Sequence, residues 1–209
     1  PPSVTLVAGF PDVVAARRAV TGVARLFRPA VLELMDRCAI SAVEATTRMG
    51  LDPEWGALLL GRSDASGARS STEMAAMQEV CEEAGATYVA CTDDEGEGEQ
   101  LMAARRMAIP AVERLGTVLI EDVGVPLPRI PELMGGVADL AERHATTIAM
   151  IGHAGDGNFH PLVTFDRGDS HAVERAERAF GAVMELALSL GGTITGEHGV
   201  GTLKLPWLG

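Results

Sequence analysis

The sequence is poor in positive charge. Its 209 residues include 17 lysines and arginines against 29 aspartates and glutamates, which gives a formal net charge of −12 at pH 7. Lys204 is the single lysine, and every other basic residue is an arginine. An acidic surface repels phosphate backbones and anionic lipid head groups. We therefore expect no nonspecific binding to nucleic acid or to a membrane surface.

Cysteines and long apolar runs are also scarce. Cys38, Cys81 and Cys91 are odd in number and lack the C-x-x-C spacing of zinc and redox sites. They indicate reduced thiols, buried as small apolar side chains, in a cytoplasmic protein. No apolar run approaches the roughly 20 residues that cross a bilayer, and no signal peptide is recognisable.

The remaining composition is that of a folded protein, with 47% hydrophobic residues and no low-complexity run. The chain lacks an initiator methionine and stops abruptly after Pro206-Trp207-Leu208-Gly209. We interpret it as a piece of a larger protein.

The pattern of apolar residues predicts an α+β fold. Strands are expected at residues 3–9, 30–35, 56–60 and 87–91, with helices between them. In the second half we expect a helix at 99–108 that ends before Pro110, and a strand at 117–123. A helix from 131, a hairpin, a helix at 170–190 and a short strand at 193–195 follow. This βαββαβ order is the ferredoxin-like unit, and the first half resembles it imperfectly. The prediction is two ferredoxin-like halves, residues 1–95 and 96–209, with antiparallel sheets covered by helices.

Histidines flank a glycine-rich turn within the predicted hairpin. The sequence from residue 152 to 160 is Gly-His-Ala-Gly-Asp-Gly-Asn-Phe-His. Asp156-Gly157 favours a two-residue type I′ turn, which would place His153 directly opposite His160. Directly opposed side chains have Cβ atoms roughly 4.5–5.5 Å apart. Two imidazoles at that separation can share one metal ion.

A second glycine-rich segment, Gly196-Glu197-His198-Gly199, adds a carboxylate and a third imidazole. Such ligands suit zinc, manganese or ferrous iron, and three protein ligands leave a position open for substrate or water. In an extended turn Glu197 and His198 would point in opposite directions. Either one could therefore be the third ligand, and the other would be free as a base.

Two further residues are candidates for the same site. Asp156 could orient a metal ligand, or it could be a plain turn residue. Arg105 could hold a substrate carboxylate, or it could be an exposed helix arginine. With these residues alone, a metal hydrolase that activates water remains a second hypothesis. A non-catalytic interaction module within a multi-subunit complex is a third.

The two segments resemble the signatures of the FAD-linked oxidase C-terminal domain. They read His-Ala-Gly-Asp-Gly-Asn-Phe-His-Pro at 153–161 and Thr-Gly-Glu-His-Gly-Val-Gly at 195–201. Residues 26–33 and 121–126 support the resemblance. This family includes the glycolate oxidase D subunit, D-lactate dehydrogenase and D-2-hydroxyglutarate dehydrogenase.

The resemblance implies a flavin-dependent oxidation of a 2-hydroxy acid. The implied metal ligands are His153, His160 and Glu197, and the implied base is His198. Arg105 and Asn158 are expected to bind the substrate, with Asp156 behind the ligands. In the hydroxyglutarate enzymes a threonine and a lysine bind a second carboxylate of the substrate. In this chain Ile109 takes the place of the threonine, and the position of the lysine falls near Ile120. The implied substrate is therefore like D-lactate or glycolate.

The resemblance also implies partners. FAD would be bound mainly by an N-terminal domain that this chain does not contain, and the C-terminal tail of such proteins is missing too. Electrons would pass to an acceptor subunit, a quinone or a cytochrome, which could hold a cytoplasmic protein at the membrane periphery. The isolated chain is expected to be inactive.

Overall fold

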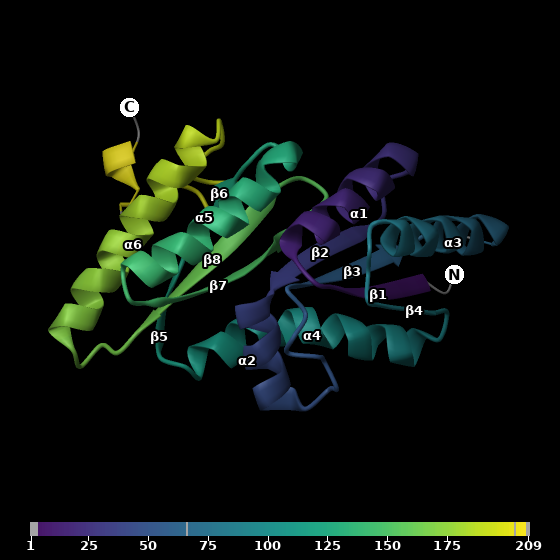
Figure 1. The fold of residues 1–209 in the computed structure, drawn as a ribbon, viewed down its shortest axis with the longest axis horizontal. Coiled ribbons are helices and arrows are strands. Elements are labelled where there is room, and N and C mark those ends of the chain that lie inside the picture. Colours follow the sequence, from purple (N-terminus) through teal and green to yellow (C-terminus); the bar gives the residue numbers. More distant parts are fainter. Residues whose placement is uncertain (1–3, 66, 203, 208–209) are drawn as a thin grey trace.

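The computed structural model describes residues 4–65, 67–202 and 204–207 (Figure 1). Ser3, where the first strand was expected to begin, lies outside them. The first half alternates strands and helices along the chain. Its elements are β1 (Val4–Phe10), α1 (Val13–Leu26), β2 (Val31–Asp36), α2 (Arg37–Thr47), β3 (Ala57–Ser63), α3 (Ala68–Glu83) and β4 (Tyr88–Thr92).

The second half begins with a long helix and contains the predicted hairpin. Its elements are α4 (Glu95–Glu113), β5 (Thr117–Ile120), β6 (Val123–Gly124), η1 (Leu127–Arg129), α5 (Ile130–Arg143), β7 (Thr147–His153), β8 (Asn158–Phe165), α6 (Ser170–Ser189) and η2 (Leu205–Trp207). The strand expected at 193–195 is absent, and Thr193 makes only an isolated bridge to Gly124.

Within the described residues the strands form one eight-stranded sheet. Its order is β4-β1-β3-β2-β7-β8-β5, with β6 also paired to β8, and the pairings are antiparallel. This confirms the α+β class with antiparallel strands under helices. The first half follows the ferredoxin-like order, with α2 inserted between β2 and β3, and the second half follows it as far as α6, without the final strand.

The two halves meet where β2 pairs with β7. The paired residues are Glu33 with His153, Leu34 with Gly152 and Met35 with Ile151. A residue of the first half is therefore held directly beside a predicted metal ligand of the second half.

Helices cover both faces of the sheet (Figure 1). One face packs against α1, α3, α5 and α6, and its core includes Phe10, Leu34 and Phe159. The other face packs against α2 and α4, and its core includes Met35 and Ile151. Because side chains alternate between faces along a strand, His153 and His160 lie on the α4 face together with Ile151.

Aspartates fix where several helices begin. The carboxylates of Asp12, Asp36, Asp94 and Asp169 each accept a hydrogen bond from a backbone N–H of the first helical turn. These N-caps satisfy donors that have no partner inside the helix, which typically stabilises a helix by about 1 kcal/mol. Asp94 caps the N-terminus of α4, the helix that contains Arg105.

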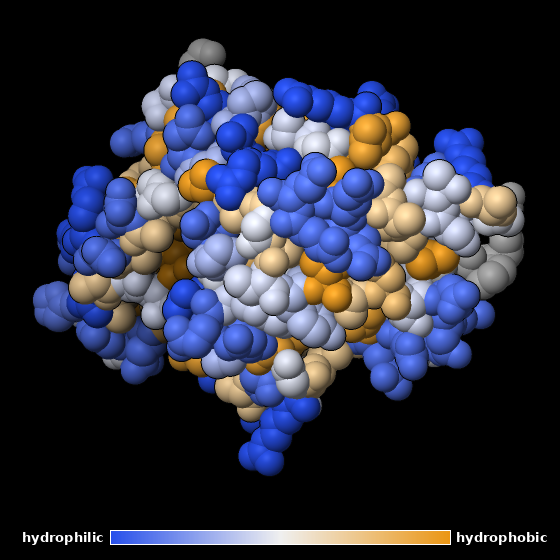
Figure 2. Space-filling view, turned by 45° about the vertical axis from the view of Figure 1, so that its right-hand side comes forward, coloured by the Kyte–Doolittle hydropathy of each residue, from blue (hydrophilic) through white to orange (hydrophobic). Residues whose placement is uncertain are grey.

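The face of the molecule drawn in Figure 2 is largely polar. Figure 2 shows hydrophilic side chains over much of one face, with hydrophobic residues in patches between them. Among the described residues no helix is both long enough and apolar enough to cross a bilayer.

Candidate metal centre

The hairpin of β7 and β8 positions both histidines, in a register different from the predicted one. His153 lies opposite Asn158, and Ile151 lies opposite His160. The connection is a four-residue loop, residues 154–157, so the two-residue type I′ turn was wrong. The histidines are diagonal neighbours, and their rings lie 5.5 Å apart, edge to face.

Tertiary contacts explain this loop. Gly157 has a φ of +83°, whereas Asp156 lies outside the positive-φ region that a type I′ turn requires at both positions. A Cβ atom on Gly157 would lie 2.1 Å from the carbonyl oxygen of Val125. The Val125 N–H also donates to the Gly157 carbonyl at 3.0 Å. The segment after β6 therefore sets the loop, which the local sequence could not reveal.

The second glycine-rich segment is held by Asp122, a residue that the sequence analysis did not single out. One Asp122 oxygen accepts hydrogen bonds from the hydroxyl of Thr195 at 2.8 Å and from the N–H groups of Gly196, Glu197 and His198 at 2.9, 3.0 and 2.7 Å. Burial opposes the charge, but these donors outweigh it and lower the pKa of Asp122 to about 2. The fully buried carboxylate thus fixes the turn that presents Glu197 and His198.

Lys204 also contacts the residues around Asp122. Its buried ammonium donates to the carbonyls of Asp122 at 3.0 Å and Ile194 at 2.7 Å. It also lies 3.3 Å from the Glu121 carboxylate. Burial raises the pKa of Glu121 to about 7, and the nearby Lys204 only partly offsets this. The single lysine of the chain therefore links the segment after α6 to residues 121–122, which follow β5.

Replacing Asp122 with asparagine is expected to lower the free energy of unfolding by about 2–3 kcal/mol at pH 7, since its pKa falls by roughly two units on folding. A depressed carboxylate pKa stabilises the fold above the unfolded pKa near 4. That stabilisation should disappear as the pH falls from about 4 to about 2. Urea unfolding across this range checks the prediction, with the exposed Asp139→Asn as control. Equal stability of Asp122→Asn and Asp139→Asn at pH 7 would contradict it.

Three side chains converge as the sequence predicted. One ligand atom each from His153, His160 and Glu197 lies within 4.8 Å of the others. Glu197 Oε1 is 3.3 Å from His160 Nε2 and 3.5 Å from His153 Nε2. Tetrahedral bonds of about 2.1 Å to zinc would place ligand atoms about 3.4 Å apart. The donor set and its spacing therefore fit a divalent ion.

His198 lies beside this group and outside it. Its ring stacks on that of His160, with centroids 4.9 Å apart and planes at 15°. The prediction that Glu197 and His198 point apart was wrong, because His198 Nε2 is 3.6 Å from Glu197 Oε1. Three successive N–H groups of this turn donate to one Asp122 oxygen, so the turn is not extended. The side chain of His198 is 50% exposed and available to a bound molecule.

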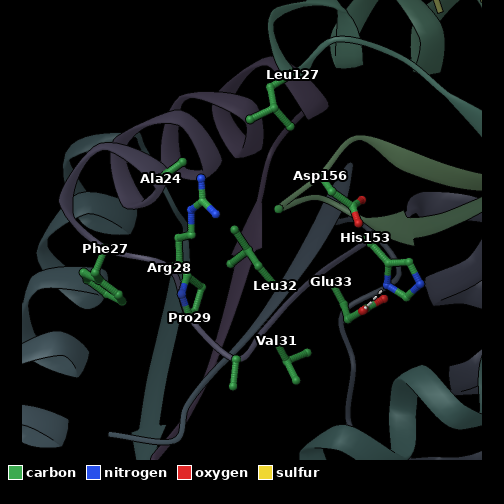
Figure 3. Close-up of a pocket in the computed structure, with 12 residues that line it drawn as sticks. Ala24, Phe27, Arg28, Pro29, Val31, Leu32, Glu33, Leu127, His153 and Asp156 are labelled. Atoms are coloured by element: carbon green, nitrogen blue, oxygen red, sulfur yellow. Dashed lines mark hydrogen bonds and ion pairs between the residues drawn. The ribbon is translucent and has the colours of Figure 1, made fainter. Parts of the chain in front are cut away.

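Glu33 is the second site residue that the sequence analysis did not single out. Its carboxylate lies 2.5 Å from His153 Nδ1 and 2.6 Å from Arg105 Nε (Figure 3 draws the contact with His153). Burial works against a charge on His153, but Glu33 outweighs it and raises the pKa of His153. Burial, together with the other two imidazoles, lowers the pKa of His160. A neutral imidazole with a free nitrogen is the form that binds a metal.

The other predicted residues lie nearby. Asp156 accepts a hydrogen bond from the Asn158 N–H at 3.0 Å, and its side chain lines the cavity beside His153 (Figure 3). The Asn158 side chain packs against Gly196, where a Cβ atom would lie 2.2 Å from Asn158 Oδ1. That oxygen is buried without a partner among the described residues. Their roles towards metal and substrate stay predictions.

A cavity of about 650 Å³ opens beside His153 (Figure 3). Its walls include Leu32, Glu33 and Asp156, and Arg28 adds a positive charge. This volume is within the range of small-molecule sites. Of the three converging side chains only that of His153 lines this cavity, whereas Glu197 and His198, both half exposed, lie outside its walls.

The chain is similar to proteins of known sequence over its whole length. Residues 1–209 match the family described as FAD linked oxidases, C-terminal domain. The chain is 36% identical to glycolate oxidase subunit GlcD of Bacillus subtilis (strain 168), over 98% of this chain and 44% of that protein. It is 31% identical to a D-lactate dehydrogenase of Archaeoglobus fulgidus, over 94% of this chain and 42% of that protein. It thus spans less than half the length of these relatives.

Solved structures share the fold at much lower identity. p-Cresol methylhydroxylase with substrate bound superimposes with a TM-score of 0.72 at 10% identity, over 93% of this chain and 45% of that chain. Alkyldihydroxyacetonephosphate synthase superimposes with a TM-score of 0.62 at 10% identity, over 92% and 39%. These likenesses show a common fold and carry no conclusion about substrate.

Proposed function

Because the chain belongs to the family of FAD-linked oxidase C-terminal domains, we propose that it is the substrate-binding part of a flavin-dependent 2-hydroxy-acid oxidase or dehydrogenase. The proposed reaction oxidises an acid like D-lactate or glycolate to its 2-keto acid. The relatives are named for the oxidation of such acids, and they are more than twice as long as this chain. The remaining length would hold the FAD-binding domain.

One observation supports this proposal above the others. Three metal-binding side chains converge, and an additional imidazole, that of His198, stacks beside them without joining the group. A structural zinc site is normally closed by four protein ligands. Three ligands beside a free base, next to a cavity, are the arrangement of a catalytic site.

His153, His160 and Glu197 would hold the metal ion. A bound divalent ion supplies Lewis acidity, which lowers the pKa of a coordinated hydroxyl group. FAD, when bound by its own domain, supplies the acceptor for the hydride that leaves the substrate Cα.

The residues of this chain bind the acid and move its proton. His198 is the proposed base, and its imidazole takes the proton of the substrate hydroxyl. Arg105 is proposed to hold the carboxylate through its terminal nitrogens, because its Nε is already bound to Glu33. Asn158 is proposed to contact the substrate from the hairpin. The half-exposed side of the site is where the flavin domain would cover the substrate and exclude water.

The surroundings of Arg105 favour a substrate with one carboxylate. Ile109 follows Arg105 by four residues in α4, so the two side chains lie on the same side of the helix. Ile109 is apolar and packs against the core between α2, α4 and the sheet. A second carboxylate placed there would lose water without gaining a partner, which typically costs about 1–3 kcal/mol.

The proposal is tested by flavin reduction in the full-length protein, which includes the FAD-binding domain. D-Lactate or glycolate is expected to reduce the flavin under anaerobic conditions. D-2-Hydroxyglutarate is expected to show a kcat/KM about 10–100-fold lower, as the unpaired carboxylate predicts. Failure of every 2-hydroxy acid to reduce the flavin would refute the proposed function. Equal use of the dicarboxylic acid would refute the role given to Ile109.

A further inference from the structure

Glu33 connects two parts of the site that come from different halves of the chain. It lies in β2, is 7% exposed, and is paired in register with His153 of β7. Figure 3 shows its side chain directed towards the His153 ring. We propose that Glu33 is a positioning residue that holds the metal ligand His153 and the carboxylate-binding Arg105 in one fixed arrangement. This inference rests on the proposed function, since it assumes a metal ion on His153.

The first contact of Glu33 selects the form of His153 that can bind a metal. Glu33 Oε1 lies 2.5 Å from His153 Nδ1. An ionised carboxylate can only accept, so the hydrogen must be on Nδ1. The lone pair of His153 Nε2 is then free to bind a metal ion, and this atom lies 3.5 Å from Glu197 Oε1. Metal-binding histidines commonly gain orientation and basicity from a carboxylate placed in this way.

The second contact orients Arg105. Glu33 Oε2 lies 2.6 Å from Arg105 Nε, and the arginine side chain is 17% exposed. A guanidinium has five N–H donors, and this contact occupies the one on Nε. The two terminal nitrogens stay available for an anion. With both oxygens engaged, Glu33 sets the distance between the metal position and the carboxylate anchor.

Glutamine cannot perform both tasks, although its shape is nearly the same. Its amide has one acceptor oxygen and one donor nitrogen, whereas His153 Nδ1–H and Arg105 Nε–H both need an acceptor. If the oxygen faces His153, the amide nitrogen meets the Arg105 donor. If the oxygen faces Arg105, the amide donates to Nδ1 and the hydrogen of His153 moves to Nε2, where it blocks metal binding.

The experiment measures zinc affinity in the full-length protein by competition with a chromophoric chelator. Glu33→Gln is expected to bind zinc about 10–100-fold more weakly than the parent, the usual effect of removing a carboxylate behind a metal-bound histidine. Glu33→Asp keeps two acceptor oxygens and should lie between the two. The matched control is Glu54→Gln, which breaks an exposed pair with Arg37 at 3.2 Å and should leave zinc affinity unchanged.

Two more variants separate positioning from general damage. Arg105→Gln should keep zinc affinity within about threefold, because Glu33 keeps its contact with His153, but raise KM for the 2-hydroxy acid through loss of the carboxylate anchor. Glu33→Gln combined with Arg105→Gln leaves no unpaired buried charge, so it keeps the inference testable if the single variant does not fold. The double variant should still bind zinc about 10–100-fold more weakly.

The outcomes distinguish this inference from the proposed function. If the parent binds zinc and the folded Glu33 variants bind it equally well, the role of Glu33 is refuted and the proposed function stands. If the parent binds none of zinc, manganese and ferrous iron, with or without flavin reduction, the metal-assisted mechanism and the role of Glu33 are both refuted.

Discussion

Replacing His198 with alanine is expected to slow flavin reduction by the 2-hydroxy acid by about 10²–10⁴-fold in the full-length protein, the usual contribution of general-base catalysis. The imidazole lies beside the three-residue group, with Nε2 3.6 Å from Glu197 Oε1, and it is half exposed. It can therefore reach a hydroxyl bound at the metal without being a ligand itself. Stopped-flow measurement of the flavin absorbance gives the rate.

This variant should leave metal content and flavin content at the parental level, because His198 is outside the ligand group. His171, exposed at the start of α6, provides the matched control, and His171→Ala should reduce its flavin normally. A parental rate in His198→Ala would place the base elsewhere. Loss of metal in His198→Ala would instead make this residue a ligand.

Replacing Glu197 with glutamine is expected to weaken zinc binding by more than about 100-fold, since a neutral amide replaces one of the three proposed protein ligands. Changes behind the ligands already cost about 10–100-fold. Glu197 is half exposed, and its N–H, not its side chain, makes the contact with Asp122, so the turn should keep its shape. The rate of flavin reduction should fall together with the metal content.

Metal analysis after gel filtration checks this prediction, and His153→Ala should behave in the same way. His171→Ala again serves as control, since it also removes an imidazole. One equivalent of tightly bound metal in both ligand variants would show that these residues do not form the site.

The sequence predicted the elements around the site because their patterns are local. Alternating apolar residues and a glycine-rich turn identified the hairpin of β7 and β8. The helix expected at 99–108 is present within α4, which begins four residues earlier, at Glu95, with Asp94 as its N-cap. The convergence of His153, His160 and Glu197 was expected too, since histidine and glutamate stand out where glycine surrounds them, and their role as metal ligands stays a prediction.

The parts that the sequence did not predict depend on distant contacts. α4 does not end before Pro110 and continues to Glu113. Pro110 lies on the exposed side of the helix. Because proline has no N–H, the carbonyl of Arg106 loses its helical partner. Arg106 is exposed too, so water can bind this carbonyl. The hairpin register depends on packing of Gly157 against Val125, which lies outside the hairpin.

Glu33 and Asp122 illustrate the same limit. Glu33 stands between apolar residues of β2, where a single acidic residue does not reveal the face to which it points. Its importance arises from pairing with His153, 120 positions away. Asp122 holds a turn that begins 73 positions later. One weak signal was present in each case: an acidic residue within a predicted strand, at 30–35 for Glu33 and at 117–123 for Asp122.

The central claim is that His153, His160 and Glu197 bind one divalent metal ion, and anomalous diffraction tests it most directly. Crystals of the full-length protein grown with zinc would be measured on both sides of the zinc absorption edge. We expect one strong anomalous peak about 2.0–2.2 Å from His153 Nε2, His160 Nε2 and a Glu197 carboxylate oxygen. A structure with zinc bound elsewhere, and no peak between these three side chains, would contradict the account.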